Sequence, residues 1–305
     1  MNTLIVKSFA KLNLFLQILN KRPDNYHNIE TLFERINLYD TITLKLRRDK
    51  LIRISCANPD LPRDETNFCY KGAKLLQEKY KVQKGADIKI LKSIPIGAGL
   101  GGGSSNAGSV FLGLNRLWKV NLSLSRLVTL SKEVGCDVPF FIYNTSFAKG
   151  SNRGDRITPL EGLKDLRLWH ILVVPKIKAS TPLIYKKWDA LPAARLPARQ
   201  GRQEFSGLTT PAYDVNIIFS ALRKKAFSLI PLLLYNSLEE VTASEYPQVR
   251  RIKEGLAGLG VKSILMSGSG PAVFGIVSSR KEAVRVSREI KKQEKSWRVF
   301  VARTV

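Results

Sequence analysis

A dense run of glycine between residues 95 and 107 constrains the fold of this chain more than any other feature. The segment reads Pro95-Ile-Gly-Ala-Gly-Leu-Gly-Gly-Gly-Ser-Ser-Asn-Ala107, and five of the seven residues from Gly97 to Gly103 are glycine. Without side chains at these positions, the backbone can approach a ligand closely and direct several N–H groups into one concavity. The run therefore predicts a cradle for a phosphate group.

The sequence on either side of this run favours a strand before it and a helix after it. Residues 86–94 carry β-branched side chains in a partly alternating pattern. After the glycines, apolar residues recur at helical spacing, and we expect Ser104, Ser105 or Asn106 to cap the start of that helix. The glycines would then deliver an anion to a helix N-terminus, where free N–H groups and the positive end of the dipole lie. The apolar stripe consists of Ala107, Val110, Phe111, Leu114, Leu117 and Trp118.

Two familiar phosphate-binding motifs do not fit this run. The P-loop is excluded because no Lys-Ser or Lys-Thr follows the glycines. Gly97, Gly99 and Gly102 match G-x-G-x-x-G, but a dinucleotide site needs an acidic residue for the ribose, and none lies between Asp87 and Glu133. The remaining alternative is a turn that is rich in glycine only for close packing. So many adjacent glycines would then cost conformational entropy with no return in packing.

The length and the pattern of elements predict an α+β protein of two domains. A chain of 305 residues with 44% hydrophobic content can bury two cores. Strands and helices alternate irregularly, and the pattern restarts near residue 155, so we expect domains at 1–155 and 156–305. Residues 137–142 lead into an extended segment, and the stretch 191–202, rich in Pro, Ala and Arg, predicts a loop. Strands are expected at 4–8, 12–19, 40–46, 52–55, 168–174, 262–265 and 273–277, and helices at 67–80, 125–134, 215–226 and 248–258.

Composition indicates a cytoplasmic protein without a metal or disulfide framework. No run of 18 or more apolar residues is present, and the start of the sequence lacks the apolar core of a signal peptide. Cys56, Cys69 and Cys136 lie far apart, and there are only two histidines, so structural zinc and disulfides are not expected.

The charge of the chain is strongly positive, with 50 Lys and Arg against 25 Asp and Glu. Such a balance attracts polyanions non-specifically, so a nucleic-acid-binding protein stays open as an alternative. The basic residues are scattered, however, and no nucleic-acid-binding motif is present. An enzyme that acts on highly phosphorylated substrates explains the same charge.

Two charged residues lie where catalysis could occur. Lys11 interrupts an apolar strand, and Asp137 precedes Val-Pro-Phe-Phe-Ile, which ought to be buried. Charges in such positions generally need a partner. The alternative is a solvated strand residue and a helix-end carboxylate. A second glycine cluster at 266–274 lies between two expected strands, and it fits either a hairpin turn or the lining of an anion site.

Four segments combine into a family resemblance: Ala10-Lys-Leu-Asn-Leu-Phe-Leu16, the glycine run, Asp137-Val-Pro-Phe-Phe141 and Ser267-Gly-Ser-Gly-Pro-Ala-Val-Phe274. Together they resemble the GHMP kinase superfamily, which includes galactokinase, homoserine kinase and mevalonate kinase. The first segment, the glycine run and Asp24-Asn-Tyr-His-Asn-Ile-Glu-Thr-Leu-Phe33 resemble the members that act on a cytidine-diphosphate-linked polyol. The resemblance covers most of the chain in order and spacing.

The resemblance implies an N-terminal ATP-binding domain like domain 2 of ribosomal protein S5, followed by a C-terminal α/β domain. It implies transfer of the γ-phosphoryl group of ATP, with Mg²⁺, to the 2-hydroxyl of 4-diphosphocytidyl-2-C-methyl-D-erythritol, in the non-mevalonate route to isopentenyl diphosphate. Neither a nucleic acid nor a membrane is needed as a partner, and the sequence sets neither the oligomeric state nor the metal ligands. Another GHMP kinase, acting on homoserine or a mevalonate derivative, is the alternative enzyme.

Site residues follow from the same resemblance. Lys11 and Asp137 would be the catalytic pair, with Asp137 orienting or deprotonating the hydroxyl and Lys11 offsetting charge. Asn13, Tyr26 and His27 match positions that hold the cytidine diphosphate, and Tyr185 matches one that stacks on the cytosine. The loop around the triphosphate would consist of Pro95, Ile96, Gly97, Ala98, Gly99, Leu100, Gly101, Gly102, Gly103, Ser104 and Ser105.

Two positions depart from the family pattern. Asn25 stands where the family usually has glycine, and Asn tolerates a positive φ better than most residues, so we expect the turn to survive. Ser237 stands where the family usually has Asp, which removes one carboxylate. Both changes bear on substrate affinity more than on the reaction.

Overall fold

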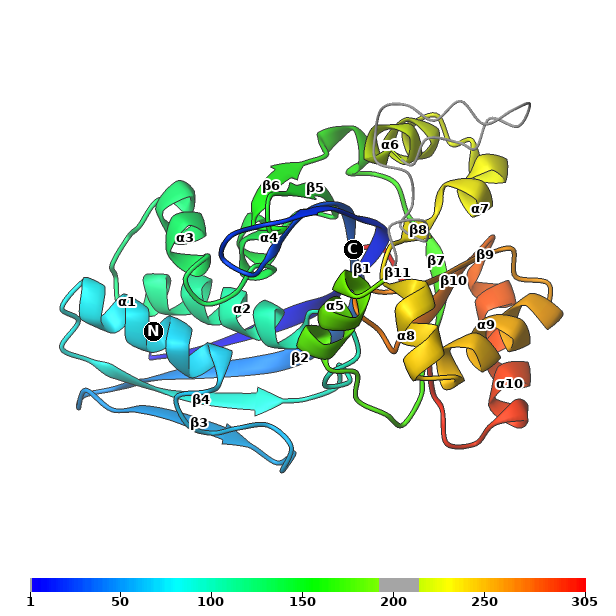
Figure 1. Ribbon diagram of the computed structural model, residues 1–305. Helices are drawn as coiled ribbons and strands as arrows, with labels where there is room; N and C mark the ends of the chain where they lie inside the picture. Colours follow the sequence, from blue (N-terminus) through cyan, green and yellow to red (C-terminus); the bar gives the residue numbers. More distant parts are fainter. Residues whose placement is uncertain (1, 192–213) are drawn as a thin grey trace.

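The computed structural model describes residues 2–191 and 214–305, in which helices pack on two β-sheets (Figure 1). The first sheet has seven strands, of which five are hydrogen-bonded in the order β3 (Ile52–Cys56), β4 (Gly85–Leu91), β2 (His27–Arg47), β1 (Thr3–Lys21) and β8 (Tyr235–Asn236). Strand β5 (Phe147–Ser151) pairs with β2, and β6 (Arg156–Pro159) pairs with β5. The second sheet has four strands in the order β11, β7, β10, β9. This mixture confirms the α+β prediction. The loop predicted at 191–202 lies, apart from Leu191, outside the described residues.

Two long strands form the centre of the first sheet. Strand β1 (Thr3–Lys21) pairs antiparallel with β2 (His27–Arg47) along nearly its whole length. The prediction of separate strands at 4–8 and 12–19 is wrong, because the ladder continues through Lys11. Three shifts of register interrupt the pairing, and such irregularities let a long ribbon bend.

Helices α1 (Phe68–Lys79) and α2 (Gly102–Leu117) pack on one face of this sheet (Figure 1). The predicted apolar stripe of α2 is buried against β2 and β4, which confirms the helix. The predicted cap is wrong, because the helix begins earlier. Its N-cap is Gly101, which is left-handed and makes no side-chain cap. The other elements here are β3 (Ile52–Cys56), β4 (Gly85–Leu91), α3 (Leu124–Ser131), α4 (Val138–Tyr143), β5 (Phe147–Ser151), β6 (Arg156–Pro159) and a 3₁₀ turn at Glu161–Leu163.

The second sheet consists of four antiparallel strands covered on one face by α9 (Gln248–Gly258) and α10 (Arg280–Gln293) (Figure 1). Its strands are β7 (Trp169–Val174), β9 (Ser263–Met266), β10 (Val273–Val277) and β11 (Arg298–Arg303). The remaining elements are α5 (Thr181–Asp189), α6 (Val215–Arg223), a 3₁₀ turn at Phe227–Leu229, α7 (Ile230–Leu233), β8 (Tyr235–Asn236) and α8 (Glu239–Glu245).

A shared hydrophobic core joins the two sheets. Leu12 and Phe15 of β1 belong to the same buried cluster as Leu172 of β7 and Phe274 of β10. Strand β8, late in the sequence, adds to the first sheet in parallel with β1. The division of the chain at residue 155 stays a prediction. Within the part of the chain that the structure describes, no helix has both the length and the apolar character needed to cross a membrane.

Candidate active site

The glycine loop has a backbone that glycine alone adopts without strain. Gly97, Gly99 and Gly101 have φ angles of +67°, +76° and +66°. These angles lie in the left-handed region, which side chains with a Cβ rarely occupy. At Gly99 a Cβ atom would also lie 2.0 Å from the carbonyl oxygen of Ser267. Gly99 is therefore required both by the left-handed backbone of the loop and by the close approach of Ser267.

Hydrogen bonds attach this loop to both sheets. The backbone N–H of Lys11, in β1, donates to the carbonyl of Leu100 at 3.0 Å. The hydroxyl of Ser267, which follows β9, donates to the carbonyl of Gly99 at 3.1 Å. The loop is thus fixed between the two sheets and is positioned before any ligand binds.

The second glycine cluster is the turn that joins β9 and β10, so it is a hairpin turn. It also lies against the catalytic candidates. Gly268 has a φ of +57°, and a Cβ there would lie 3.3 Å from Nζ of Lys11 and 3.4 Å from Oδ1 of Asn13. Asn236 donates through Nδ2 to the carbonyls of Met266 and Gly268, each at 2.8 Å, and holds the turn in place. A role for this turn in binding an anion stays a prediction.

The N-terminus of α2 opens directly from the glycine loop. The first hydrogen bond of the helix runs from the N–H of Ser105 to the carbonyl of Gly101, at 2.8 Å. The N–H groups ahead of it therefore have no partner within the helix. The Ser105 hydroxyl lies 2.7 Å from that of Ser8, which also donates to Asn106 Oδ1, so these side chains anchor α2 to β1. The start of α2 offers its N–H groups and the positive end of a 16-residue helix to an anion.

Lys11 and Asp137 form an ion pair beside this loop. Nζ of Lys11 lies 3.5 Å from Oδ2 of Asp137, and a Cβ at Gly101 would lie 3.0 Å from Cγ of the same lysine. Lys11 is buried, so the solvated-strand alternative is wrong. Asp137 does lie at a helix end, at the N-cap of α4, and its side chain is about one-third exposed. Burial lowers the pKa of Lys11, and the charge and hydrogen bond of Asp137 act in the opposite direction.

Asn13 connects this pair to the neighbouring strand. Its Oδ1 accepts a hydrogen bond from Nζ of Lys11, and its Nδ2 donates to Oγ1 of Thr31 at 2.7 Å. The Thr31 hydroxyl in turn donates to the carbonyl of Phe15 at 2.6 Å. The chain of contacts fixes the position of the Lys11 ammonium group.

The aromatic residues predicted to hold a base lie in a second cluster. Tyr185, in α5, stacks on the ring of His27 with centroids 5.1 Å apart and an angle of 30°. Burial raises the pKa of Tyr185, and the negative charge of Asp137 adds to the rise, which relates this cluster to the ion pair. Tyr26 lies apart on the β1–β2 turn, 51% exposed, with the guanidinium of Arg153 at 5.0 Å from its ring centre.

Both departures from the family pattern have a local structural explanation. Asn25 has a φ of +64° in the turn, so the expectation that this turn survives is confirmed. The hydroxyl of Ser237 accepts a hydrogen bond from the N–H of Ile18 at 3.0 Å. Ser237 therefore serves to attach β8 to β1.

Several polar residues of the site escaped the sequence analysis. Ser8 and Thr31 were given no role, and only the pairing of distant segments brings them to the site. Ser267 belongs to the glycine cluster at 266–274, but its hydrogen bond to the glycine loop could not be read from the sequence. Trp188 and Asp189 follow Tyr185 at helical spacing and also contact His27. For Trp188 and Asp189, the signal in the sequence was their helical spacing from Tyr185.

Residues that could hold a metal ion are sparse. Among the residues described, no three His, Cys, Asp or Glu side chains gather into a metal site. Oxygen donors beside the loop include the carboxylate of Asp137 and the hydroxyl of Ser104, which has no hydrogen-bond partner in the described part of the chain. A cation here would depend mainly on the phosphates of a nucleotide.

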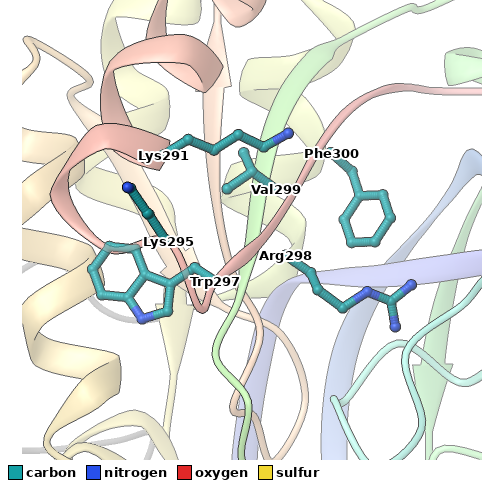
Figure 2. A pocket seen from close by; sticks show the side chains of 6 residues that line it. All are labelled: Lys291, Lys295, Trp297, Arg298, Val299 and Phe300. Carbon is teal, nitrogen blue, oxygen red and sulfur yellow. The ribbon is translucent and has the colours of Figure 1, made fainter.

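A separate hollow of about 490 Å³ lies between the C-terminal end of α10 and strand β11. Figure 2 shows the side chains around it, with Lys291 and Lys295 from one side and Arg298 and Phe300 from the strand. No carboxylate lines it among the described residues, so it is a positively charged surface. It shares no lining residue with the candidate active site.

Comparisons with known proteins identify the family. The model for the GHMP kinases N terminal domain matches residues 67–145, and that for the GHMP kinases C terminal matches residues 218–296. A 4-diphosphocytidyl-2-C-methyl-D-erythritol kinase of Geobacillus sp. (strain WCH70) is 38% identical over 286 residues, 93% of this chain and 91% of that one. The enzyme of the same name from Bacillus subtilis (strain 168) is 38% identical over 93% of this chain and 91% of its own.

Solved structures agree with this assignment. The crystal structure of a 4-(cytidine 5'-diphospho)-2C-methyl-D-erythritol kinase matches with a TM-score of 0.75 and 28% identity, over 98% of both chains. A homoserine kinase from Cytophaga hutchinsonii ATCC 33406 matches with a TM-score of 0.71 over 100% of this chain and 95% of its own, and at 18% identity it supports the fold alone. The chain therefore belongs to the GHMP kinases, ATP-dependent small-molecule phosphotransferases, and within them to the 4-diphosphocytidyl-2-C-methyl-D-erythritol kinase family.

Proposed function

We propose that this protein transfers the γ-phosphoryl group of ATP to the 2-hydroxyl of 4-diphosphocytidyl-2-C-methyl-D-erythritol, in the methylerythritol phosphate route to isopentenyl diphosphate. The observation that carries the proposal is the Lys11–Asp137 pair, 3.5 Å apart, which lies beside the glycine loop and whose carboxylate acts electrostatically on Tyr185, stacked on His27. A base on one side and phosphates on the other suit a substrate that contains a cytidine. Relatives that share 38% identity carry the name of this activity.

Phosphoryl transfer depends on positioning and on stabilisation of charge. The N–H groups of the glycine loop and of the first turn of α2 bind the triphosphate, so that the γ-phosphorus faces Asp137. Asp137 accepts the proton of the 2-hydroxyl as the oxygen attacks that phosphorus. The bond from the γ-phosphorus to the bridging oxygen breaks, and ADP leaves with the electron pair.

Lys11 contributes charge without taking part in bonding. Its ammonium group stabilises the carboxylate of Asp137 and offsets the negative charge that develops on the transferred group. The site excludes much water around Lys11, where electrostatic interactions are stronger than in bulk solvent. The hydrogen bond to Asn13 holds the lysine during this step.

The nucleoside end of the substrate binds the aromatic cluster. Tyr185 offers a planar face for stacking on the cytosine, worth about 1–3 kcal/mol per base in comparable sites. His27 makes the polar contact to the base, and Tyr26 and Asn13 help to hold the cytidine-diphosphate substrate. We propose these roles for the four residues, and we propose that the protein acts in the cytoplasm.

Mg²⁺ completes the proposed site. Magnesium in kinases is held by one or two protein oxygens together with phosphates of the substrate. The donors present, the Asp137 carboxylate and the Ser104 hydroxyl, fit such a partial set. When bound, the ion neutralises charge on the phosphates.

The test is coupled release of ADP by purified protein with ATP, Mg²⁺ and the cytidine substrate, alongside homoserine and mevalonate. We expect turnover with the cytidine substrate alone and inhibition by CMP. Asp137→Asn should lower kcat by at least about 100-fold, as expected for loss of a general base. Asp165→Asn, which changes an exposed carboxylate elsewhere, is the matched control. Folded protein that releases no ADP with the cytidine substrate contradicts the proposal.

A further inference from the structure

One face of helix α5 encloses the ring of His27. Tyr185, Trp188 and Asp189 follow the spacing i, i+3, i+4, so their side chains lie on the same face. Tyr185 stacks on the imidazole, Trp188 meets it edge-on with centroids 5.6 Å apart, and Asp189 contacts its Nε2 at 2.6 Å. His27 is only 5% exposed, so the ring is held in a single orientation.

The contact with Asp189 determines where the ring carries its proton. Burial alone would raise the pKa of Asp189, but hydrogen bonds from Lys21 and His27 hold it below its usual value. The carboxyl is therefore ionised at neutral pH and can only accept hydrogen bonds. At 2.6 Å from such a group, Nε2 of His27 must be the donor.

The other ring nitrogen is left as an acceptor. Lys21 lies 2.6 Å from the same carboxylate, so Asp189 has a cationic partner besides the ring. In a neutral imidazole with hydrogen on Nε2, Nδ1 has a free lone pair. In the described part of the chain, Nδ1 of His27 has no hydrogen-bond partner. This atom is not fully buried, whereas Nδ1 of His170 is both unpaired and fully buried. It is therefore available to a ligand.

We propose that Asp189 is a positioning residue that sets base specificity, because it fixes hydrogen on Nε2 of His27 and so presents Nδ1 to an amino group of the substrate base. This inference rests on the proposed function. Cytosine carries such a donor, its exocyclic N4 amine, whereas uracil has an acceptor at the matching position. The arrangement selects cytidine and rejects uridine through two facing lone pairs.

The first test is the tautomer itself, measured in the unmodified protein. The chain has only two histidines, so ¹⁵N-labelled histidine gives few signals to assign. We expect hydrogen on Nε2 and none on Nδ1 of His27 at neutral pH. Hydrogen on Nδ1, alone or on both nitrogens, overturns the proposal whatever the variants do.

The second test is kinetic and uses Asp189→Asn. An amide side chain can either donate or accept, so it no longer fixes the tautomer. Against the uridine-diphosphate analogue of the substrate, the preference in kcat/KM should fall about tenfold or more, mainly through a higher KM for the cytidine substrate, with kcat little changed. The matched control is Glu245→Gln, which removes the carboxylate paired with Lys187 of the same helix and should keep the preference.

The outcomes separate this inference from the proposed function. If the wild-type protein turns over neither compound, the proposed function fails, and the NMR result alone decides the tautomer. If the wild-type protein uses the cytidine and uridine compounds equally, or Asp189→Asn keeps the full preference, the inference fails while the kinase activity stands. A lost preference in both Asp189→Asn and Glu245→Gln would assign the effect to helix packing and would also overturn it.

Discussion

Substitution of Gly99 by alanine tests how the phosphate loop is held. Gly99 has a φ of +76°, and the left-handed region costs a residue with a Cβ about 1–2 kcal/mol. The new methyl group would also lie 2.0 Å from the backbone oxygen of Ser267, so the two segments would have to separate. Overpacking of this kind typically costs about 1–3 kcal/mol. Together we expect a loss of roughly 2–5 kcal/mol in the free energy of unfolding.

Thermal unfolding followed by circular dichroism measures this loss. At about 2–4 °C per kcal/mol for a chain near this size, Tm should fall by roughly 4–20 °C. Because the displaced loop would also misplace its N–H groups, the KM for ATP should rise about tenfold or more. Gly258→Ala is the control, since no atom lies within 4 Å of its added Cβ and its φ is not positive. Equal Tm values for the two variants, with an unchanged KM for ATP, would refute the reasoning.

Three further predictions follow from other features of the molecule. Lys11→Met removes the cation 3.5 Å from Asp137, so steady-state kinetics should show kcat lowered about 100- to 1,000-fold. A kcat within about threefold of wild type would assign the charge compensation to another group. Burial, together with the charge of Asp137, raises the pKa of the Cys136 thiol from 9.0 to about 11, so less thiolate is present at pH 8. Alkylation of Cys136 by iodoacetamide at pH 8, followed by mass spectrometry, should therefore be about 100-fold slower than in unfolded protein. Equal alkylation rates would contradict the burial of this thiol. The combined variant Lys291→Glu, Lys295→Glu should elute from a heparin column at lower salt with unchanged ATP turnover, whereas unchanged elution would mean that polyanions bind elsewhere.

Features that depend on local chemistry were predictable from the sequence. The strand, glycine loop and helix between residues 86 and 118 form one continuous unit, and its glycines and apolar spacing specify it without distant partners. The cap was wrong because Gly101 itself adopts the left-handed conformation that starts α2. Ser105 instead bonds to Ser8, on a strand 97 residues away, which no local pattern reveals.

Features that depend on partners far along the chain were not predictable in this way. Separate strands were expected on either side of Lys11, but the strand continues through this residue, whose charge is compensated by Asp137 far along the chain. Asp189 lies on a short helix with no unusual composition. Its partner His27 is 162 residues earlier, so only the folded chain reveals the contact.

The attachment of the glycine loop to both sheets has a consequence for folding. The bond from Ser267 to Gly99 spans 168 residues, and that from the N–H of Asn13 to the Ser267 hydroxyl spans 254. Contacts between such distant segments form slowly, because the entropy of closing the intervening chain is lost before they can form. We therefore expect the nucleotide site to form late, after the two sheets have docked. ATP should then bind the native state and not its precursors, and stabilise the completed fold by mass action.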